Sequence, residues 1–316
     1  MRQVQSTIED IAFKLRIPQR KAWGSMQSDV DAATKLMQQP DKVLYGVQPK
    51  DMAQGQQLVK AIVEELRRVG AAIDARDPDK TAQRVGVTLH DVAELELLQA
   101  AGISFAIPKE YANLPRLTGR AVAEVVIERP DGSLSFVDNA GGGLQAQAKL
   151  ELVLDGYSAP ISAGNFVVNL MQGMYDGRPL NVSYASILAG AGAAPGKTIP
   201  LENLPAGQFD PVYRLPLEVQ AGELPVLPLS IFGAVAMAHT ADPEDGLAAG
   251  DEFFIYKFDR QNLGGLSGLA FDEGKFGVFG YVTKGAELIS QLQPGDVIVS
   301  AKLLSGQDRL VLPQSN

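Results

Sequence analysis

The first hundred residues repeat their apolar side chains at intervals of three and four, the spacing of helices that bury one face. Pro18 follows the first stripe and breaks or kinks it, and an Asp-Pro pair at 77 and 78 provides a helix start. The four stripes span residues 4–15, 23–37, 52–73 and 85–98. Four such segments with short connections predict an antiparallel helical bundle.

The polar residues of this bundle are predicted to face solvent. The charged run of the third stripe consists of Glu64, Glu65, Arg67 and Arg68, which we place on the outer side of the helix. The glutamines at 38, 39, 54, 56 and 57 are interpreted as a solvated face rather than a recognition surface. Better support for a partner site would be an apolar stripe left exposed after the bundle closes.

The pattern changes between residues 108 and 118, where two prolines predict a linker between a helical domain, 1–107, and a second domain, 119–316. Residues 121–128 have the Val-Val-Ile content of a strand. The Pro-Asp-Gly turn after it predicts a hairpin with residues 133–137, which we expect to tie the two domains together.

The second domain continues with two-residue alternation. Residues 144–154 place leucine and alanine at every other position, which predicts a strand with one buried face. Further along, Phe253, Phe254 and Ile255 form a short apolar run typical of a strand that is buried on both faces. A second such strand contains Val278 and Phe279, with glycines at 277 and 280 that indicate a bulge or a close backbone approach. Two strands of this kind form a wall that can bind an apolar group.

Composition narrows the possible functions. The chain has 28 basic and 37 acidic residues, a net charge of -9, and no basic cluster, so nucleic acid is not an expected partner. No apolar run reaches the ~18 to 20 residues of a membrane span. Without cysteine there is no thiolate chemistry. His90 and His239 stand alone in the sequence, and we predict neither a metal site nor a cofactor.

Several blocks in the second domain, taken together, resemble the cyclophilin family. They comprise an Asn-Phe helix ending in Tyr-x-Gly at 160–177, Ala-Met-Ala at 236–238, the Phe-Phe-Ile and Val-Phe-Gly strands within 250–285, and a helix with a Gly-Asp turn at 286–298. They follow the family's order over about residues 144–312. The resemblance implies an antiparallel β-barrel with capping helices, giving a multidomain α + β protein.

The resemblance also implies an activity, the rotation of Xaa-Pro bonds. This rotation needs no nucleophile, because the barrier of ~18 to 20 kcal/mol comes from amide resonance. In the family, an arginine after a Phe-His pair is thought to hydrogen-bond the prolyl nitrogen. Here Leu180 and Asn181 fall on that pair and Val182 falls on the arginine. Arg178, or Arg214, is the candidate for a substitute donor.

The resemblance further implies an apolar slot that grips the proline ring. Glu252 stands where the family has Gln, His239 where it has Asn, Ala270 where it has Trp, and Phe276 where it has His. The residues predicted to form the substrate-binding site are Phe254, Ala238, Met237, Ile187, Leu188, Phe276, Phe271, Glu252 and His239.

The helical domain joined to a degenerate barrel resembles the large thylakoid-lumen cyclophilins of plants and cyanobacteria. This implies a role in photosystem II assembly and a lumenal or periplasmic location, reached with a targeting peptide absent from this numbering. The first hypothesis is an assembly chaperone that binds Pro-containing lumenal segments in the barrel, and partners or itself through the bundle, with weak or no catalysis. The alternatives are an active isomerase with a substitute arginine, and a scaffold that binds only through the bundle.

Overall fold

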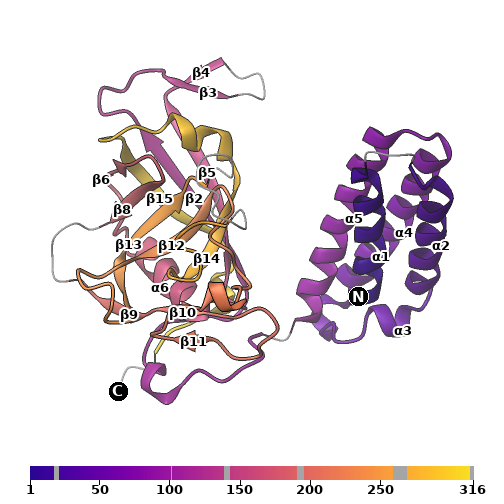
Figure 1. Ribbon diagram of the computed structural model, residues 1–316, viewed down its shortest axis with the longest axis horizontal. Coiled ribbons are helices and arrows are strands. Elements are labelled where there is room, and N and C mark those ends of the chain that lie inside the picture. The colour runs from indigo at the N-terminus through magenta and orange to yellow at the C-terminus, as the bar shows by residue number, and fades with distance from the viewer. Residues whose placement is uncertain (18–20, 101, 139–142, 191–195, 259–268, 314–316) are drawn as a thin grey trace. The chain divides into compact units, whose positions relative to one another are not determined.

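The chain forms two compact units, Met1–Ala101 and Gly102–Asn316, each with its own core. The structure is a computed structural model and describes residues 1–17, 21–100, 102–138, 143–190, 196–258 and 269–313. The first unit is helical and the second is built around a β-sheet (Figure 1). The predicted linker segment, 108–118, lies in the second unit and contains a 3₁₀ turn, Lys109–Tyr111, and the first short strand.

The first unit is a four-helix bundle with one additional short helix. Its apolar stripes meet in one core, in which Ile8, Met26, Leu66 and Leu95 are fully buried, and the helical prediction is confirmed. The last long helix begins as predicted, with the Asp77 side chain accepting a hydrogen bond from the Lys80 amide. The helices are α1 (Arg2–Arg16), α2 (Trp23–Met37), α3 (Pro40–Val43), α4 (Met52–Asp74) and α5 (Pro78–Gln99).

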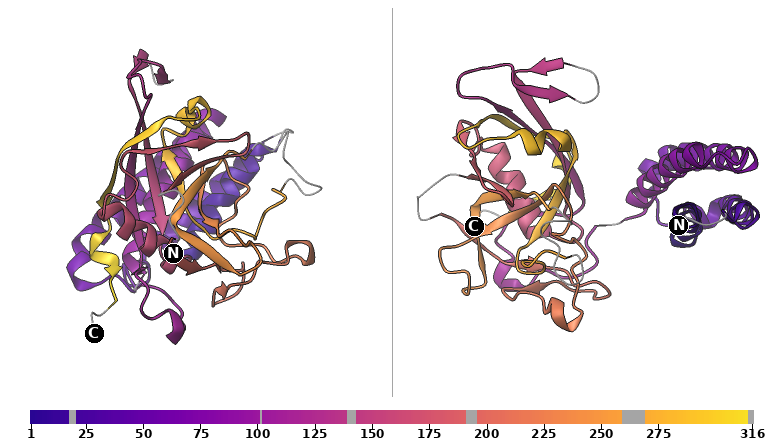
Figure 2. Two further views of the ribbon diagram at one scale, coloured as in Figure 1. Left: turned by 90° about the vertical axis from the view of Figure 1, so that its left-hand side faces the viewer. Right: turned by 45° about the horizontal axis from the view of Figure 1, so that its top comes forward.

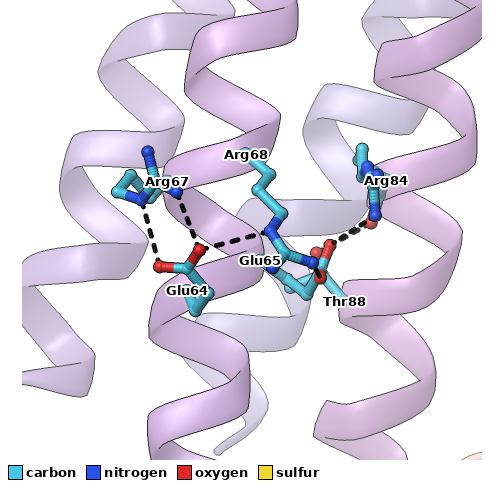
Figure 3. Close-up of polar contacts among 6 residues, drawn as sticks. All are labelled: Glu64, Glu65, Arg67, Arg68, Arg84 and Thr88. Carbon is cyan, nitrogen blue, oxygen red and sulfur yellow. Dashed lines mark hydrogen bonds and ion pairs between the residues drawn. The ribbon is translucent and has the colours of Figure 1, made fainter.

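One charged residue of this bundle faces inward. Glu65 is 7% exposed, so its predicted position on the solvent face is wrong. Figure 3 shows its carboxylate between two arginines: Arg68 lies 2.6 Å away on the same helix and Arg84 3.4 Å away on α5. A buried carboxylate needs such partners, because desolvation of an unpaired charge costs several kcal/mol. The ion pair between Glu65 and Arg84 therefore links α4 to α5.

The second unit is a nearly closed antiparallel barrel, which confirms the predicted fold class. Its ten-stranded sheet runs in the order β6-β15-β2-β5-β14-β12-β13-β8-β7, and β9 adds to β13. The two ends, β6 and β7, are consecutive in the chain, so the sheet curls back on itself. Its strands are β2 (Arg120–Glu128), β5 (Gln147–Asp155), β6 (Arg178–Pro179), β7 (Asn181–Val182), β8 (Ser186–Gly190), β9 (Thr198–Pro200), β12 (Ala234–His239), β13 (Leu247–Tyr256), β14 (Val278–Lys284) and β15 (Val297–Ser305).

The remaining strands form pairs outside the barrel. β1 (Arg116–Leu117) pairs with β16 (Leu310–Val311), and β10 (Glu202–Asn203) pairs with β11 (Val212–Tyr213). The last pair, β3 (Phe136–Asp138) and β4 (Gly143–Gln145), projects from the barrel as an arm (Figures 1 and 2).

The predicted hairpin between residues 121–128 and 133–137 is wrong. β2 pairs with β5 and β15 in the barrel wall, while β3 pairs with β4. The reason is burial: β2 carries apolar residues on alternate positions that fill the barrel, and only long-range partners can cover them. The arm is attached to the barrel by Gln291, whose amide pairs with both backbone groups of Val137.

Helix α6 (Pro160–Met171) packs against the barrel strands and is capped from a distant segment. The Glu202 carboxylate accepts hydrogen bonds from the amides of Ile161 and Ser162, at 3.0 and 2.9 Å, and from the Tyr213 hydroxyl at 3.2 Å. These amides are among those that a helix cannot satisfy internally. Glu202 is 1% exposed, and burial raises its pKa to about 7 despite these hydrogen bonds. The segment around β10 is therefore held to the start of α6.

The shifted pKa of Glu202 predicts how stability depends on pH. An acid whose pKa rises on folding stabilises the fold fully at a pH below its pKa in the unfolded chain, 4.5. This stabilisation is lost as the pH rises through the pKa in the folded protein, about 7. In Glu202→Gln, the side chain stays neutral at every pH. Relative to this variant, the wild type should lose about 3 kcal/mol of unfolding free energy between pH 4.5 and pH 8.

Urea unfolding of both proteins across this pH range, followed by near-UV circular dichroism, measures the difference. Glu218→Gln, which changes an exposed carboxylate in the following segment, serves as the control and should run parallel to the wild type. Parallel curves for Glu202→Gln would show that the carboxyl keeps its ordinary pKa on folding.

Candidate functional site

Strands β12, β13 and β14 form a wall with an apolar layer on each face. Successive side chains of a strand point to opposite faces, so Phe253 and Ile255 enter the barrel interior while Phe254 and Tyr256 face outward. The outward layer, here called the outer cluster, has a core of Leu229, Ala234, Ala236, Phe254, Tyr256, Phe258, Ala270 and Val278, with Leu188, Ala238 and Phe276 packed against it.

The outer cluster contains four of the predicted slot residues, Phe254, Leu188, Ala238 and Phe276. The Phe276 ring meets the Phe254 ring edge to face, with centroids 4.9 Å apart. The Phe276 ring also contacts the His239 ring, with centroids 4.3 Å apart. Phe254 is only 6% exposed. The segment before β14 thus packs an aromatic ring against Phe254, one of the predicted slot residues.

His239 lies at the border between this apolar layer and a group of charges. Burial lowers its pKa, opposed by a hydrogen bond with the Leu247 backbone and by the negative charges of Asp245 and Asp272. The neutral imidazole is therefore favoured and packs on Phe276 as an apolar ring.

Two loops that contribute residues to the outer cluster are held together by one buried carboxylate. Glu273 accepts hydrogen bonds from the backbone amides of Leu229 and Ser230, at 2.7 and 2.8 Å, and from the Ser230 hydroxyl. The Ser230 oxygen in turn accepts a hydrogen bond from the Ala270 amide at 2.7 Å. Sequence reasoning missed Glu273, because an acidic pair in a turn has the pattern of a solvated loop.

Other predicted site residues lie elsewhere. Ile187 and Met237 are buried in the barrel interior, on the opposite side of the wall from Phe254. Phe271 is 82% exposed at the surface of its loop. Val182 lies opposite Ile187 across the β7–β8 ladder and packs against the interior cluster. Glu252 is partly buried on β13, two residues before Phe254.

The two candidate arginines both donate to backbone carbonyls. The Arg178 Nε atom lies 3.4 Å from the Met174 oxygen, and β6, which contains Arg178, pairs with β15. The Arg214 guanidinium lies 2.9 Å from the Asp245 oxygen, on the loop that leads into β13. Neither contact directs a guanidinium at Phe254.

The barrel sequence decides the family. Residues 143–307 match the model described as cyclophilin type peptidyl-prolyl cis-trans isomerase/CLD. This chain belongs to the cyclophilin family. Residues 1–98 match a second model, described as the PsbQ-like domain of CYP38-like peptidyl-prolyl cis-trans isomerases. Cyclophilins bind proline-containing substrates. The recognition from sequence, a helical domain joined to a cyclophilin barrel, is confirmed.

Three curated cyclophilins are similar over nearly the whole chain. The chloroplastic peptidyl-prolyl cis-trans isomerase CYP37 of Arabidopsis thaliana is 46% identical, with 100% of this chain and 68% of the relative covered. A putative thylakoid lumen isomerase of Synechocystis sp. is 34% identical over 98% of this chain and 80% of its own. The chloroplastic CYP38 of Arabidopsis thaliana is 28% identical over 99% and 72%.

A solved structure, the Mimivirus cyclophilin, is also similar, with 15% sequence identity and a TM-score of 0.40. The similarity covers 60% of this chain and 92% of the Mimivirus chain.

Among the helices that the structure describes, none is long and apolar enough to cross a membrane.

Replacement of Glu273 tests how much its hydrogen bonds to Leu229 and Ser230 stabilise the outer cluster. In Glu273→Ala, two backbone amides and a hydroxyl lose a charged acceptor, and we expect unfolding free energy to fall by about 2 to 4 kcal/mol. Asp272→Ala is the matched control, because the neighbouring Asp272 side chain is half exposed and, among the described residues, forms its ion pair with the exposed Lys275. It should change stability by less than about 0.5 kcal/mol. If the two variants lower the unfolding free energy equally in chemical denaturation, the hydrogen bonds of Glu273 do not stabilise the fold.

Proposed function

We propose that this cyclophilin is mainly a binding protein for Pro-containing segments, with weak or absent isomerase activity. The observation that carries the proposal is the contrast between Phe254 and Val182. The apolar residues Phe254, Leu188 and Ala238 gather on the outer face of one wall. We infer from the sequence that Val182 takes the position of the family's catalytic arginine; its side chain has no hydrogen-bond donor and packs against the interior cluster.

The missing donor is expected to reduce turnover more than binding. Stabilisation of a twisted amide needs a preorganised donor at the prolyl nitrogen, and loss of one such donor costs ~2.7 to 4 kcal/mol in the transition state. Binding of the proline ring depends instead on apolar surface, of which each Å² buried contributes ~25 cal/mol. On this inference, the chain would keep the apolar residues that bind a proline ring and would lack the donor.

Catalysis by a substitute arginine is the second candidate. Arg214 is the better placed of the two, because Asp245, whose carbonyl it binds, lies on the loop beside His239. Arg178 binds the Met174 carbonyl instead.

A scaffold that binds only through its helical unit is the third candidate. The low exposure of Phe254, beneath the Phe276 ring, favours it. A closed outer cluster would leave the bundle as the binding part of the chain, for a partner or for a second copy.

The proposed setting is the thylakoid lumen, with photosystem II assembly as the process. The relatives support the location through their names, which include chloroplastic and thylakoid lumen proteins. The PsbQ-like description of the helical unit supports the process. The bound segments would then be lumenal parts of photosystem II proteins.

Turnover separates the first two candidates. In an NMR exchange assay on an Xaa-Pro peptide, we expect a catalytic efficiency roughly a hundred- to a thousandfold below that of a cyclophilin with its arginine. Arg178→Ala and Arg214→Ala should leave this residual rate unchanged. Brisk isomerisation that either variant abolishes would instead identify a substitute donor.

Peptide binding separates the first and third candidates. A labelled Pro-containing peptide should bind the full chain, and Phe254→Ala should weaken it about tenfold or more, because most of the ring contact is lost. Phe254→Leu, which preserves the apolar character, should bind more tightly than Phe254→Ala. Circular dichroism of each variant establishes that the barrel is folded. If the wild type binds no Pro-containing peptide, the scaffold remains.

A further inference from the structure

Glu252 lies on the same face of β13 as Phe254. The two residues are separated by one position, so their side chains point outward about 7 Å apart along the strand. Across the β13–β8 ladder, the partner of Phe254 is Leu188, and the partner of Glu252 is Gly190. On the β8 side, the carboxylate therefore adjoins the predicted proline position with a glycine opposite it.

Within the residues that the structure describes, the Glu252 carboxylate forms no ion pair and accepts no hydrogen bond. Two acidic groups that act on His239 are paired: Asp245 accepts hydrogen bonds from Thr240 and from the Leu247 amide, and Asp272 pairs with Lys275. The buried Glu202 and Glu273 are likewise satisfied by backbone amides.

A partly buried carboxylate without a partner loses hydration and gains nothing within the fold. The cost is recovered when a bound molecule supplies the positive charge. An extended peptide rises about 3.3 Å per residue, so with a proline ring at Phe254 the neighbouring one or two residues lie over Glu252. Lysine and arginine can lay an apolar stem along the outer cluster and bring the charged end to the carboxylate.

We propose that Glu252 selects Pro-containing segments with a lysine or arginine one or two residues from the proline. The inference rests on the proposed function, because it requires that such segments bind at Phe254. It adds a specificity that follows from the charge and position of Glu252. Such a contact distinguishes between partners more than it adds to affinity for all of them.

The test compares matched peptides by fluorescence anisotropy. Each has one proline and carries lysine, norleucine or glutamate one or two positions from it, on either side. Norleucine keeps the stem of lysine without the charge. At low salt, the full chain should bind at least one of the lysine peptides about three- to tenfold more tightly than its norleucine counterpart. Glutamate should bind most weakly, and 0.5 M salt should reduce the differences.

Glu252→Gln should abolish the preference for lysine, so that the lysine and norleucine peptides bind this variant equally. Glutamine has nearly the same shape and is the residue that other cyclophilins place here. Glu287→Gln, which removes an exposed carboxylate from the 3₁₀ turn Ala286–Gln291, should retain the preference. Glu252→Lys should reverse it in favour of the glutamate peptide.

The failures of the two proposals are distinguishable. Equal binding of the lysine and norleucine peptides at every position, or a lysine preference that survives in Glu252→Gln, overturns the role of Glu252 and leaves proline binding intact. If no peptide of the set binds at all, the proposed function fails and this inference fails with it.

Discussion

The pleat of β13 is the constraint on which both the barrel and the site depend. Because neighbouring side chains of a strand point to opposite faces, the run Phe253, Phe254, Ile255 supplies an interior core and an outer cluster at once. A shift of one residue in the β13–β8 register would exchange the two faces. Phe253 is fixed inside by ring contacts with Phe166 and Tyr175, at 5.0 and 4.9 Å, and this holds Phe254 outside.

Three buried carboxylates fasten the irregular segments to this regular frame. Glu202 holds the segment around β10 to the first turn of α6, and Glu273 holds together the two loops that contribute Leu229 and Ala270 to the outer cluster. Asp296 pairs with Arg129 and accepts from the Gln293 amide, next to the point where the arm is attached. In each case a carboxyl group replaces water as the partner of backbone amides that would otherwise be buried unsatisfied.

Under the proposed function, the polar groups of the site differ from those of the family more than its apolar groups do. On the alignment that we infer from the sequence, Val182, Phe276 and Glu252 take the places of the family's arginine, histidine and glutamine. Two of these substitutions would extend apolar surface, and the third would introduce a charge. We propose that a site of this kind suits the binding of a segment of chosen composition better than the stabilisation of a twisted amide.

The sequence by itself determined the elements and the family. Local spacing sufficed for the four long helices, for β5, and for the apolar strands around Phe254 and Val278, since each depends on residues close in the chain. The same local pattern misassigned Glu65, whose burial depends on Arg84 on another helix, and paired β2 with β3, because strand partners are chosen by the barrel as a whole.

Of the site, the sequence supplied the outer residues Phe254, Leu188, Ala238 and Phe276. Only the tertiary structure decided that Ile187 and Met237 face the interior, that the Phe276 ring packs edge to face on Phe254, and that Glu273 binds two loops together. The physical reason is the same throughout. Segments tens of residues away decide which face of a strand is buried and which donors a carboxylate binds. The local periodicity of the sequence does not predict such contacts.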